Sequence, residues 1–197
     1  GRFVTVFSLM MVVQQLDAGP IVARQTLEIL DDDDARSVSF IAATLGADML
    51  IRVIDEAEQT GVIESVEQDP EGVTYAEPIR KEEGRIPWDD PSEQILIRMR
   101  GLVPWPGTYS HIDGKRLTHI PNAEPLWPNE AKELDEIDEW RPVFVSSIKK
   151  GFGFTVKTGD GHLLVTRVRP SGKKEMDATA FVNGRGIAVG EWLGDED

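Results

Sequence analysis

Residues 149–161 read KKGFGFTVKTGDG, and the Asp160-Gly161 pair at the end of this stretch determines how the second half of the chain is interpreted. An Asp-Gly pair between two apolar runs is a strong hairpin signal. Asp113-Gly114 is a second pair of this kind. About five short strands separated by such turns are typical of a small barrel of the oligonucleotide-binding type. The strands predicted in this way are Thr108–Ile112, Lys115–Ile120, Val143–Ile148, Phe152–Lys157 and His162–Arg169.

The string KGFGF within this stretch is similar to strands of cold-shock-type barrels, where aromatic rings stack on unpaired bases. Phe152 and Phe154 are two residues apart, so in a continuous strand they face the same side. We expect both rings to fill the barrel interior. A base-stacking platform is the alternative that the sequence leaves open.

The first part of the chain has a different pattern. The apolar run Phe3–Val13 predicts a strand buried on both faces, as in a parallel sheet. After the turn sequence LDAGP at 16–20, Ile21–Ile29 predicts a second strand, and the acidic run Asp31–Asp34 precedes a helix that ends near Gly61. A strand, a strand and a helix cannot close an α/β layer alone. Residues 1–61 are therefore expected to form an incomplete layer.

Residues 62–88 are polar and contain several Pro and Gly, which predicts an extended linker. A short helix is then predicted to run to about Arg100. Its start is indicated by Asp90 as N-cap, Pro91 in the first turn and the acidic Glu93 at the third position. The predicted fold class is α/β plus all-β. Its domains are 1–61, the linker 62–88 and a barrel over 89–197.

Composition limits the chemistry. The 197 residues include no cysteine, which excludes disulfides, thiolate metal sites and cysteine nucleophiles. His111, His119 and His162 are scattered without a carboxylate or a second histidine at ligand spacing, so we expect solvent-exposed strand histidines and no metal. The longest apolar run, Phe3–Val13, is too short to cross a bilayer, and no membrane association is expected.

The net charge of −14 argues against a simple nucleic-acid binder, but the charge is uneven. Residues 1–140 hold 12 Lys and Arg against 28 Asp and Glu, a balance of −16. Residues 141–174 hold 8 basic residues against the single Asp160. A basic stripe on an acidic chain can contact phosphates.

Several blocks in this order resemble the C-terminal two-thirds of the methionyl-tRNA formyltransferase family. LDAGP at 16–20 is similar to the family's catalytic-aspartate loop, and VTYAEPIRKEEGRIPW at 73–88 to its linker. Four further blocks are similar to the family's second domain: PWPG at 104–107, GKRL at 114–117, TGDGHLLVTRVRPSGKKEM at 158–176 and FVNGRGIAVGEWLG at 181–194. The resemblance implies a partial Rossmann-like formyltransferase layer, a linker and an OB-like barrel of the tRNA-binding type.

The resemblance also implies a function in translation initiation. The family transfers a formyl group from 10-formyltetrahydrofolate, its co-substrate, to the amino group of methionine on the initiator tRNA. Asp17 matches the catalytic aspartate, which orients a histidine, and Leu16, Ala18 and Gly19 would line the folate side of the loop. Together with the basic stripe, the resemblance indicates these contacts to initiator methionyl-tRNA: Lys81, Arg85, Lys115, Arg116, Lys149, Lys150, Lys157, Arg167, Arg169, Lys173 and Lys174.

The family's catalytic asparagine and histidine would precede Phe3, so by itself this chain is expected to be inactive. One alternative is that the chain is part of an intact enzyme, whose other half lies on the same protein or on another chain. A second is an inactive relative in an organellar ribonucleoprotein, and a third is an RNA-binding module alone. The acidic segment 129–140, NEAKELDEIDEW, is either a solvated insertion or a docking surface for a basic partner. The expected location is the bacterial cytoplasm or an organelle matrix.

Overall fold

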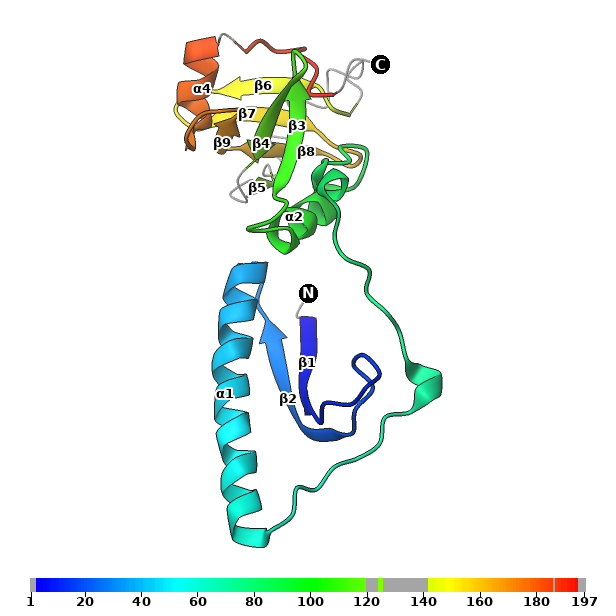
Figure 1. The fold of residues 1–197 in the computed structure, drawn as a ribbon. Coiled ribbons are helices and arrows are strands. Elements are labelled where there is room, and N and C mark those ends of the chain that lie inside the picture. Colours follow the sequence, from blue (N-terminus) through cyan, green and yellow to red (C-terminus); the bar gives the residue numbers. More distant parts are fainter. Residues whose placement is uncertain (1–2, 120–123, 126–141, 186, 195–197) are drawn as a thin grey trace. The chain divides into compact units, whose positions relative to one another are not determined.

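The computed structural model describes residues 3–119, 124–125, 142–185 and 187–194. It divides into two units, Gly1–Pro78 and Ile79–Asp197, which are described separately here as unit 1 and unit 2 (Figure 1). The division lies inside the predicted linker 62–88. The last part of that segment belongs to unit 2, because Ile86 and Trp88 are buried in its core. The acidic segment 129–140 lies outside the described residues.

Unit 1 begins with an antiparallel hairpin. Strand β1 (Phe3–Met10) pairs with β2 (Ile21–Ile29), with Phe3 opposite Ile29. The parallel arrangement predicted for β1 is therefore wrong, since the loop between the strands turns the chain back on itself. An uninterrupted apolar run indicates burial but carries no information about the direction of the neighbouring strand.

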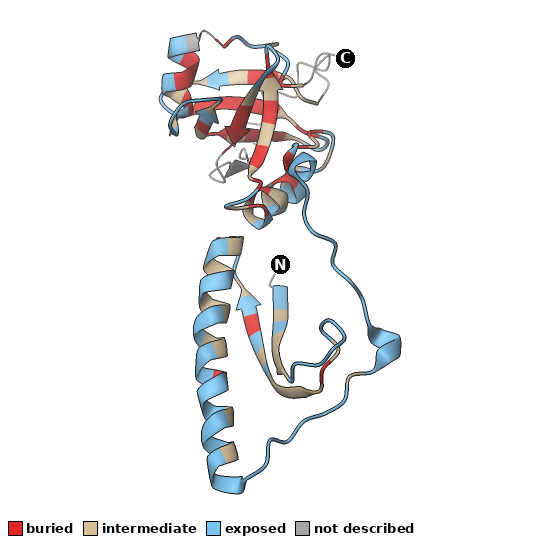
Figure 2. Cartoon of the chain, in the orientation of Figure 1, coloured by how far each residue is buried: buried red, intermediate tan, exposed pale blue. Residues whose placement is uncertain are grey.

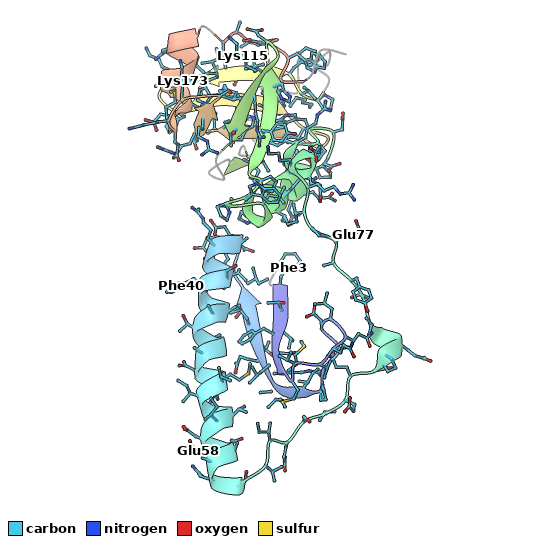
Figure 3. All side chains as sticks on the ribbon, viewed as in Figure 1. Phe3, Phe40, Glu58, Glu77, Lys115 and Lys173 are labelled. Atoms are coloured by element: carbon cyan, nitrogen blue, oxygen red, sulfur yellow. The ribbon has the colours of Figure 1, made fainter. Side chains whose placement is uncertain are left out.

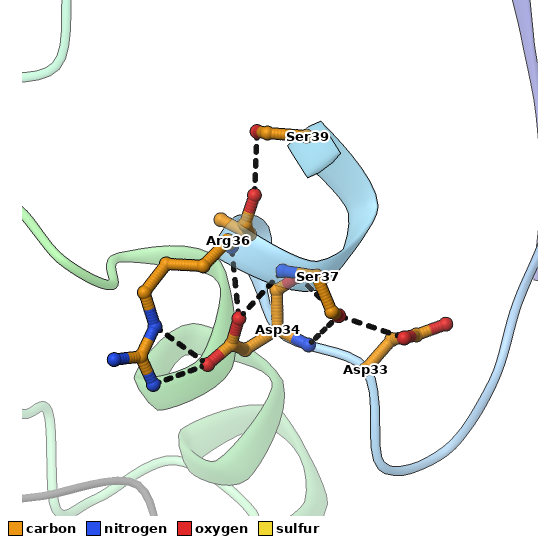
Figure 4. A network of polar contacts seen from close by, with 6 residues as sticks. Asp33, Asp34, Arg36, Ser37 and Ser39 are labelled. Carbon is orange, nitrogen blue, oxygen red and sulfur yellow. Dashed lines mark hydrogen bonds and ion pairs between the residues drawn. The ribbon is translucent and has the colours of Figure 1, made fainter. Parts of the chain in front are cut away.

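Helix α1 (Ala35–Thr60) follows β2 and begins at the predicted acidic run. The Asp34 carboxylate accepts hydrogen bonds from the backbone N–H of Arg36 and Ser37, at 2.8 and 3.0 Å, and the Ser37 hydroxyl accepts one from the Asp34 N–H at 3.0 Å (Figure 4). This reciprocal arrangement is a capping box. The Arg36 guanidinium holds the pKa of Asp34 below its usual value. The helix ends as predicted at Gly61, whose φ of 75° is the left-handed conformation typical of a helix stop.

Little of unit 1 is buried. Leu27 and Met49 are its buried hydrophobic side chains among the described residues, and Figure 2 shows most of α1 and β1 as exposed or intermediate. Phe40 is 75% exposed and projects from the side of α1 away from the hairpin (Figure 3). An exposed apolar surface on this scale marks a contact with other protein or with a membrane.

Helix α1 is also long and apolar enough, by length and composition, to cross a membrane. The mean hydropathy of its most apolar window is 1.6, and 6% of that window is buried. A helix whose apolar side is covered by other protein passes the same test, so this property is weak evidence for a membrane span.

Unit 2 contains two four-stranded antiparallel sheets. One has the order β10-β9-β4-β3 and the other β5-β8-β7-β6. The strands are β3 (Thr108–Ile112), β4 (Lys115–His119), β5 (Glu124–Pro125), β6 (Val145–Lys149), β7 (Gly153–Lys157), β8 (His162–Val165), β9 (Arg167–Pro170) and β10 (Met176–Asp177). The chain passes from one sheet to the other at Thr166, which splits the single strand predicted over 162–169. Across the described residues no ladder joins the two sheets into a closed barrel, so the predicted OB-like barrel is not confirmed.

The helices of unit 2 cover this pair of sheets. The short helix α2 (Ser92–Gly101) buries Ile95 and Met99, and α4 (Ala178–Arg185) lies beside β7 and β10. The predictions did not include α4. A single apolar core joins both sheets to the two helices (Figure 2).

Two local predictions in unit 2 were wrong. Phe154 is fully buried, but Phe152 is 66% exposed, because it lies in the turn before β7 rather than in the strand. Helix α2 begins after Pro91 without a cap from Asp90; instead the carboxylate of Asp160 accepts a hydrogen bond from the Ser92 N–H at 2.7 Å. This bond holds the pKa of Asp160 below its usual value.

Candidate functional site

The loop between β1 and β2 presents Asp17 on an exposed turn. Asp17 has a φ of 54°, in the left-handed region that few residues other than Gly, Asn and Asp adopt. Leu16 beside it is 74% exposed, Ala18 is half-buried and Gly19 is buried. The loop therefore exposes the Asp17 carboxylate together with apolar side chains, of which Val12 and Leu16 are the most exposed.

Close backbone contacts fix the base of this loop. The Met11 N–H donates to the carbonyl oxygen of Pro20 at 2.9 Å. A Cβ on Gly19 would lie 1.7 Å from the carbonyl oxygen of Met11. Only glycine fits at this position, so the glycine of LDAGP has a structural reason independent of any ligand.

A residue from the end of unit 1 holds the loop from outside. The Gln68 side-chain Nε2 donates hydrogen bonds to the carbonyl oxygens of Asp17 and Gly19, at 2.9 and 2.7 Å. Next to it, Val66 and Ile21 exchange backbone hydrogen bonds of 2.7 and 2.8 Å. Gln68 was not among the predicted site residues, because no pattern along the chain connects residues about fifty positions apart.

The Asp17 carboxylate has no hydrogen-bond partner in the described part of unit 1. It cannot act on a neighbouring histidine there, because His111, His119 and His162 all lie in unit 2. No group of three or more metal-ligating residues is found within the described ranges.

In unit 2, the outer face of the β3-β4-β9 sheet carries aromatic and basic side chains. Directly opposite residues in an antiparallel pair share a face. Thr118 on β4 lies opposite Tyr109 on β3 and opposite Arg169 on β9, and Arg116 lies opposite His111. The other face of β3 and β4 carries residues of the buried core, including Ile112 and Leu117.

Arg116 is the most closely held cation on this face. Its Cζ atom lies 3.8 Å from the centroid of the Tyr109 ring, and its Nη2 donates to the carbonyl oxygen of Pro106 at 3.3 Å. The Tyr109 ring in turn packs edge-on against His111, with centroids 5.4 Å apart. A guanidinium stacked on an aromatic ring keeps its charge and its outer donors available.

Two adjoining depressions collect several of the predicted cations. The smaller, of about 330 Å³, is lined by Lys81, Arg116, Arg169, Lys173 and the half-exposed Trp105. The larger, of about 740 Å³, shares Arg116, Pro170, Ser171 and Lys173, and adds Lys115. Lys115 and Lys173 both project from unit 2 (Figure 3). We name Lys81, Lys115, Arg116, Arg169 and Lys173 the basic face.

The other predicted cations lie elsewhere or are paired. Lys149 and Lys150 lie at the turn between β6 and β7, and Lys157 ends β7. The guanidinium of Arg167 is paired with the carboxylates of Glu175 and Asp177, at 2.6 and 2.9 Å. Arg85 lines a separate small depression beside Trp88, and Lys174 follows Lys173 in the same turn.

The prediction of exposed histidines was wrong for two of the three. His162 is buried, and its Nδ1 lies 2.8 Å from the Ser146 hydroxyl, which also bonds Thr155. His119 is 1% exposed, packs edge-on against Trp88, and burial lowers its pKa to about 3. Neither ring nitrogen of His119 has a partner among the described residues. Both histidines lie on strand faces that turn inward, which hydropathy alone did not indicate.

The two units together thus define a class of protein: a partial α/β layer with an aspartate loop, followed by a two-sheet domain with a basic face. The family model "Formyl transferase, C-terminal domain" matches residues 78–186. The chain therefore belongs to the formyl transferase family. It is 31% identical over 188 residues to the methionyl-tRNA formyltransferase of Fusobacterium nucleatum and 32% identical over 202 residues to that of Bacillus licheniformis.

These alignments include 94% and 100% of this chain but 57% and 59% of the relatives, so the chain spans a little over half of their length. Among solved structures, HypX from Aquifex aeolicus in complex with tetrahydrofolic acid matches 95% of this chain and 31% of its own, with a TM-score of 0.65 and 18% identity. An N-formyltransferase from Helicobacter canadensis in complex with folinic acid and dTDP-3-aminofucose matches 82% and 55%, with a TM-score of 0.55 and 14% identity. At these identities the likeness establishes the fold.

Proposed function

We propose that this chain is the C-terminal part of an enzyme that moves a formyl group from 10-formyltetrahydrofolate to the amino group of methionyl-initiator tRNA. It would act in the bacterial cytoplasm or an organelle matrix. The observation that carries the proposal is the basic face of unit 2, where five cations and an exposed Trp105 surround two joined depressions on a chain of net charge −14. Such a concentration of cations on an acidic protein suits a polyanionic backbone.

Unit 1 would supply one catalytic group. In formyl transfer the amine nitrogen attacks the formyl carbon, and the bond from that carbon to the folate nitrogen breaks. The amine loses a proton and the folate nitrogen gains one. The donor supplies the activated formyl group. Asp17 would hold and charge-stabilise the histidine that accepts the proton, and Leu16, Ala18 and Gly19 would contact the folate. The exposed apolar surface of unit 1 would be covered by the part of the enzyme that the longer relatives contain, on the same or another chain.

A binding titration tests the RNA contact. Initiator-tRNA affinity is measured at several salt concentrations for the chain, for a triple variant Lys81→Gln, Arg116→Gln and Lys173→Gln, and for a control Lys149→Gln and Lys150→Gln. Each lost phosphate contact reduces the slope of log affinity against log salt by about 0.9. We expect the triple variant to lose about 2 to 3 units of slope, and the control less than one. A slope unchanged in the triple variant would remove the basic face from RNA binding.

A further inference from the structure

The segment after α1 is a structural part of the Asp17 loop. It returns to the start of β2, where Val66 and Ile21 exchange two backbone hydrogen bonds. Two residues later, the side chain of Gln68 reaches the loop itself. A segment that sequence analysis assigns to a linker thus contacts the residues predicted to meet folate.

The two bonds from Gln68 use one atom. Its Nε2 carries two hydrogens, and the carbonyl oxygens of Asp17 and Gly19 accept one each. These carbonyls belong to the Asp17–Ala18 and Gly19–Pro20 peptide units, so a single amide fixes two peptide units of the loop. The oxygen end of the amide could not replace it, because a carbonyl oxygen donates no hydrogen bond.

The loop needs an external constraint of this kind. Asp17 has a left-handed φ of 54° and its side chain is exposed, so packing does little to hold its conformation. Backbone in sparsely populated regions persists where the surroundings over-determine it. Here the constraints are the bond from Met11 to Pro20, the close approach at Gly19 and the two bonds from Gln68.

We propose that Gln68 is a positioning residue, which fixes the backbone of the Asp17 loop and so aims the Asp17 carboxylate. Gln68 does not touch the reacting atoms; it acts through the carbonyls of Asp17 and Gly19. This inference rests on the proposed function in assigning a catalytic role to Asp17, but the structural constraint itself can be measured without any activity.

Amide hydrogen exchange on this chain tests the constraint. Gln68→Ala removes both donors, and Gln68→Glu keeps the shape while placing carboxylate oxygens against two carbonyl oxygens. Gln59→Ala is the matched control, because Gln59 is an exposed glutamine at the end of α1. We expect the hydrogen-bonded amides of Met11, Ile21 and Val66 to exchange about 5- to 10-fold faster in both Gln68 variants, with Gln68→Glu the faster, while α1 is unchanged. Equal exchange in Gln68→Glu and Gln59→Ala would overturn the proposal.

Kinetics of the complete enzyme of the proposed function test the consequence. For Gln68→Ala we expect kcat to fall about 10-fold and the KM for methionyl-tRNA to stay within about 2-fold, since misplacing a catalytic group affects the transition state more than binding. The melting temperature should match that of Gln59→Ala. Unchanged kcat alongside faster exchange would overturn the positioning role. A wild-type protein without formyl transfer would instead overturn the proposed function and leave the exchange measurement to decide the constraint.

Discussion

The guanidinium of Arg116 lies over the ring of Tyr109, with its Cζ atom 3.8 Å from the ring centroid. The two residues come from adjacent strands, and their faces are set by the register that pairs Tyr109 with Thr118. The stack holds the guanidinium between the two depressions of the basic face. An arginine already fixed in this way loses little side-chain entropy when it binds a phosphate.

Replacing Arg116 with Ala should weaken RNA binding about 5- to 10-fold at 0.1 M salt and reduce the salt slope by about one. Arg116→Lys should keep the slope but lose part of the affinity, because an ammonium does not stack as a planar guanidinium does. Fluorescence anisotropy with a labelled tRNA measures both quantities.

Arg167→Ala is the matched control for that experiment. Its guanidinium is already paired with Glu175 and Asp177, so its loss should change RNA affinity less than about 2-fold. If Arg167→Ala weakened binding as much as Arg116→Ala, the assignment of the basic face to one side of unit 2 would be wrong.

Gly19→Ala should disrupt the Asp17 loop. The added Cβ would lie 1.7 Å from the Met11 carbonyl oxygen, so the backbone must move. We expect the free energy of unfolding of unit 1 to fall by more than about 1 kcal/mol, because the native backbone leaves no room for the added Cβ. Gly46→Ala in α1 is the control: nothing lies within 4 Å of its added Cβ, and it should stabilise the helix by up to about 1 kcal/mol. Urea unfolding followed by the helical circular dichroism signal compares the two; equal effects would contradict the expected steric clash.

Asp160→Ala should destabilise unit 2 by about 1 kcal/mol, because it removes the acceptor that caps α2 at the Ser92 N–H. Asp90→Ala should change stability by less than about 0.5 kcal/mol, since the Asp90 side chain does not cap the helix. All five tryptophans lie in unit 2, so their fluorescence reports the unfolding of this unit. A larger effect of Asp90→Ala would show that Asp90 caps α2, as the sequence predicted.

The stability of unit 2 should depend on pH through His119. Burial lowers its pKa from 6.5 to about 3 in the folded state, so the unfolded chain binds more protons between these values. Stability is therefore complete above about pH 6.5 and should fall by up to about 1.4 kcal/mol per pH unit below it. In His119→Leu the slope between pH 6.5 and 4.5 should be smaller, as measured by urea unfolding with tryptophan fluorescence. An identical slope would show that another group titrates.

Local signals in the sequence were sufficient to predict many of the turns and helix ends of the fold. The Asp113-Gly114 and Asp160-Gly161 pairs located two hairpins, and Asp34 and Gly61 bounded α1, because turns and helix ends depend on a few adjacent residues. The order of the motif blocks identified the family over nearly the whole chain.

Only the tertiary structure decided which distant groups meet. The sequence placed Asp17 in a turn, but Gln68 reaches that turn from about fifty residues away, and Asp160 caps a helix that begins 68 residues earlier. The sequence indicated eleven candidate cations for RNA contact. The strand register places Arg116 on the basic face, whereas ion pairs neutralise the charge of Arg167. Composition and spacing determine which elements form, because these depend on neighbours in sequence. The packing of the sheets determines which side chains share a surface, and no local pattern encodes that.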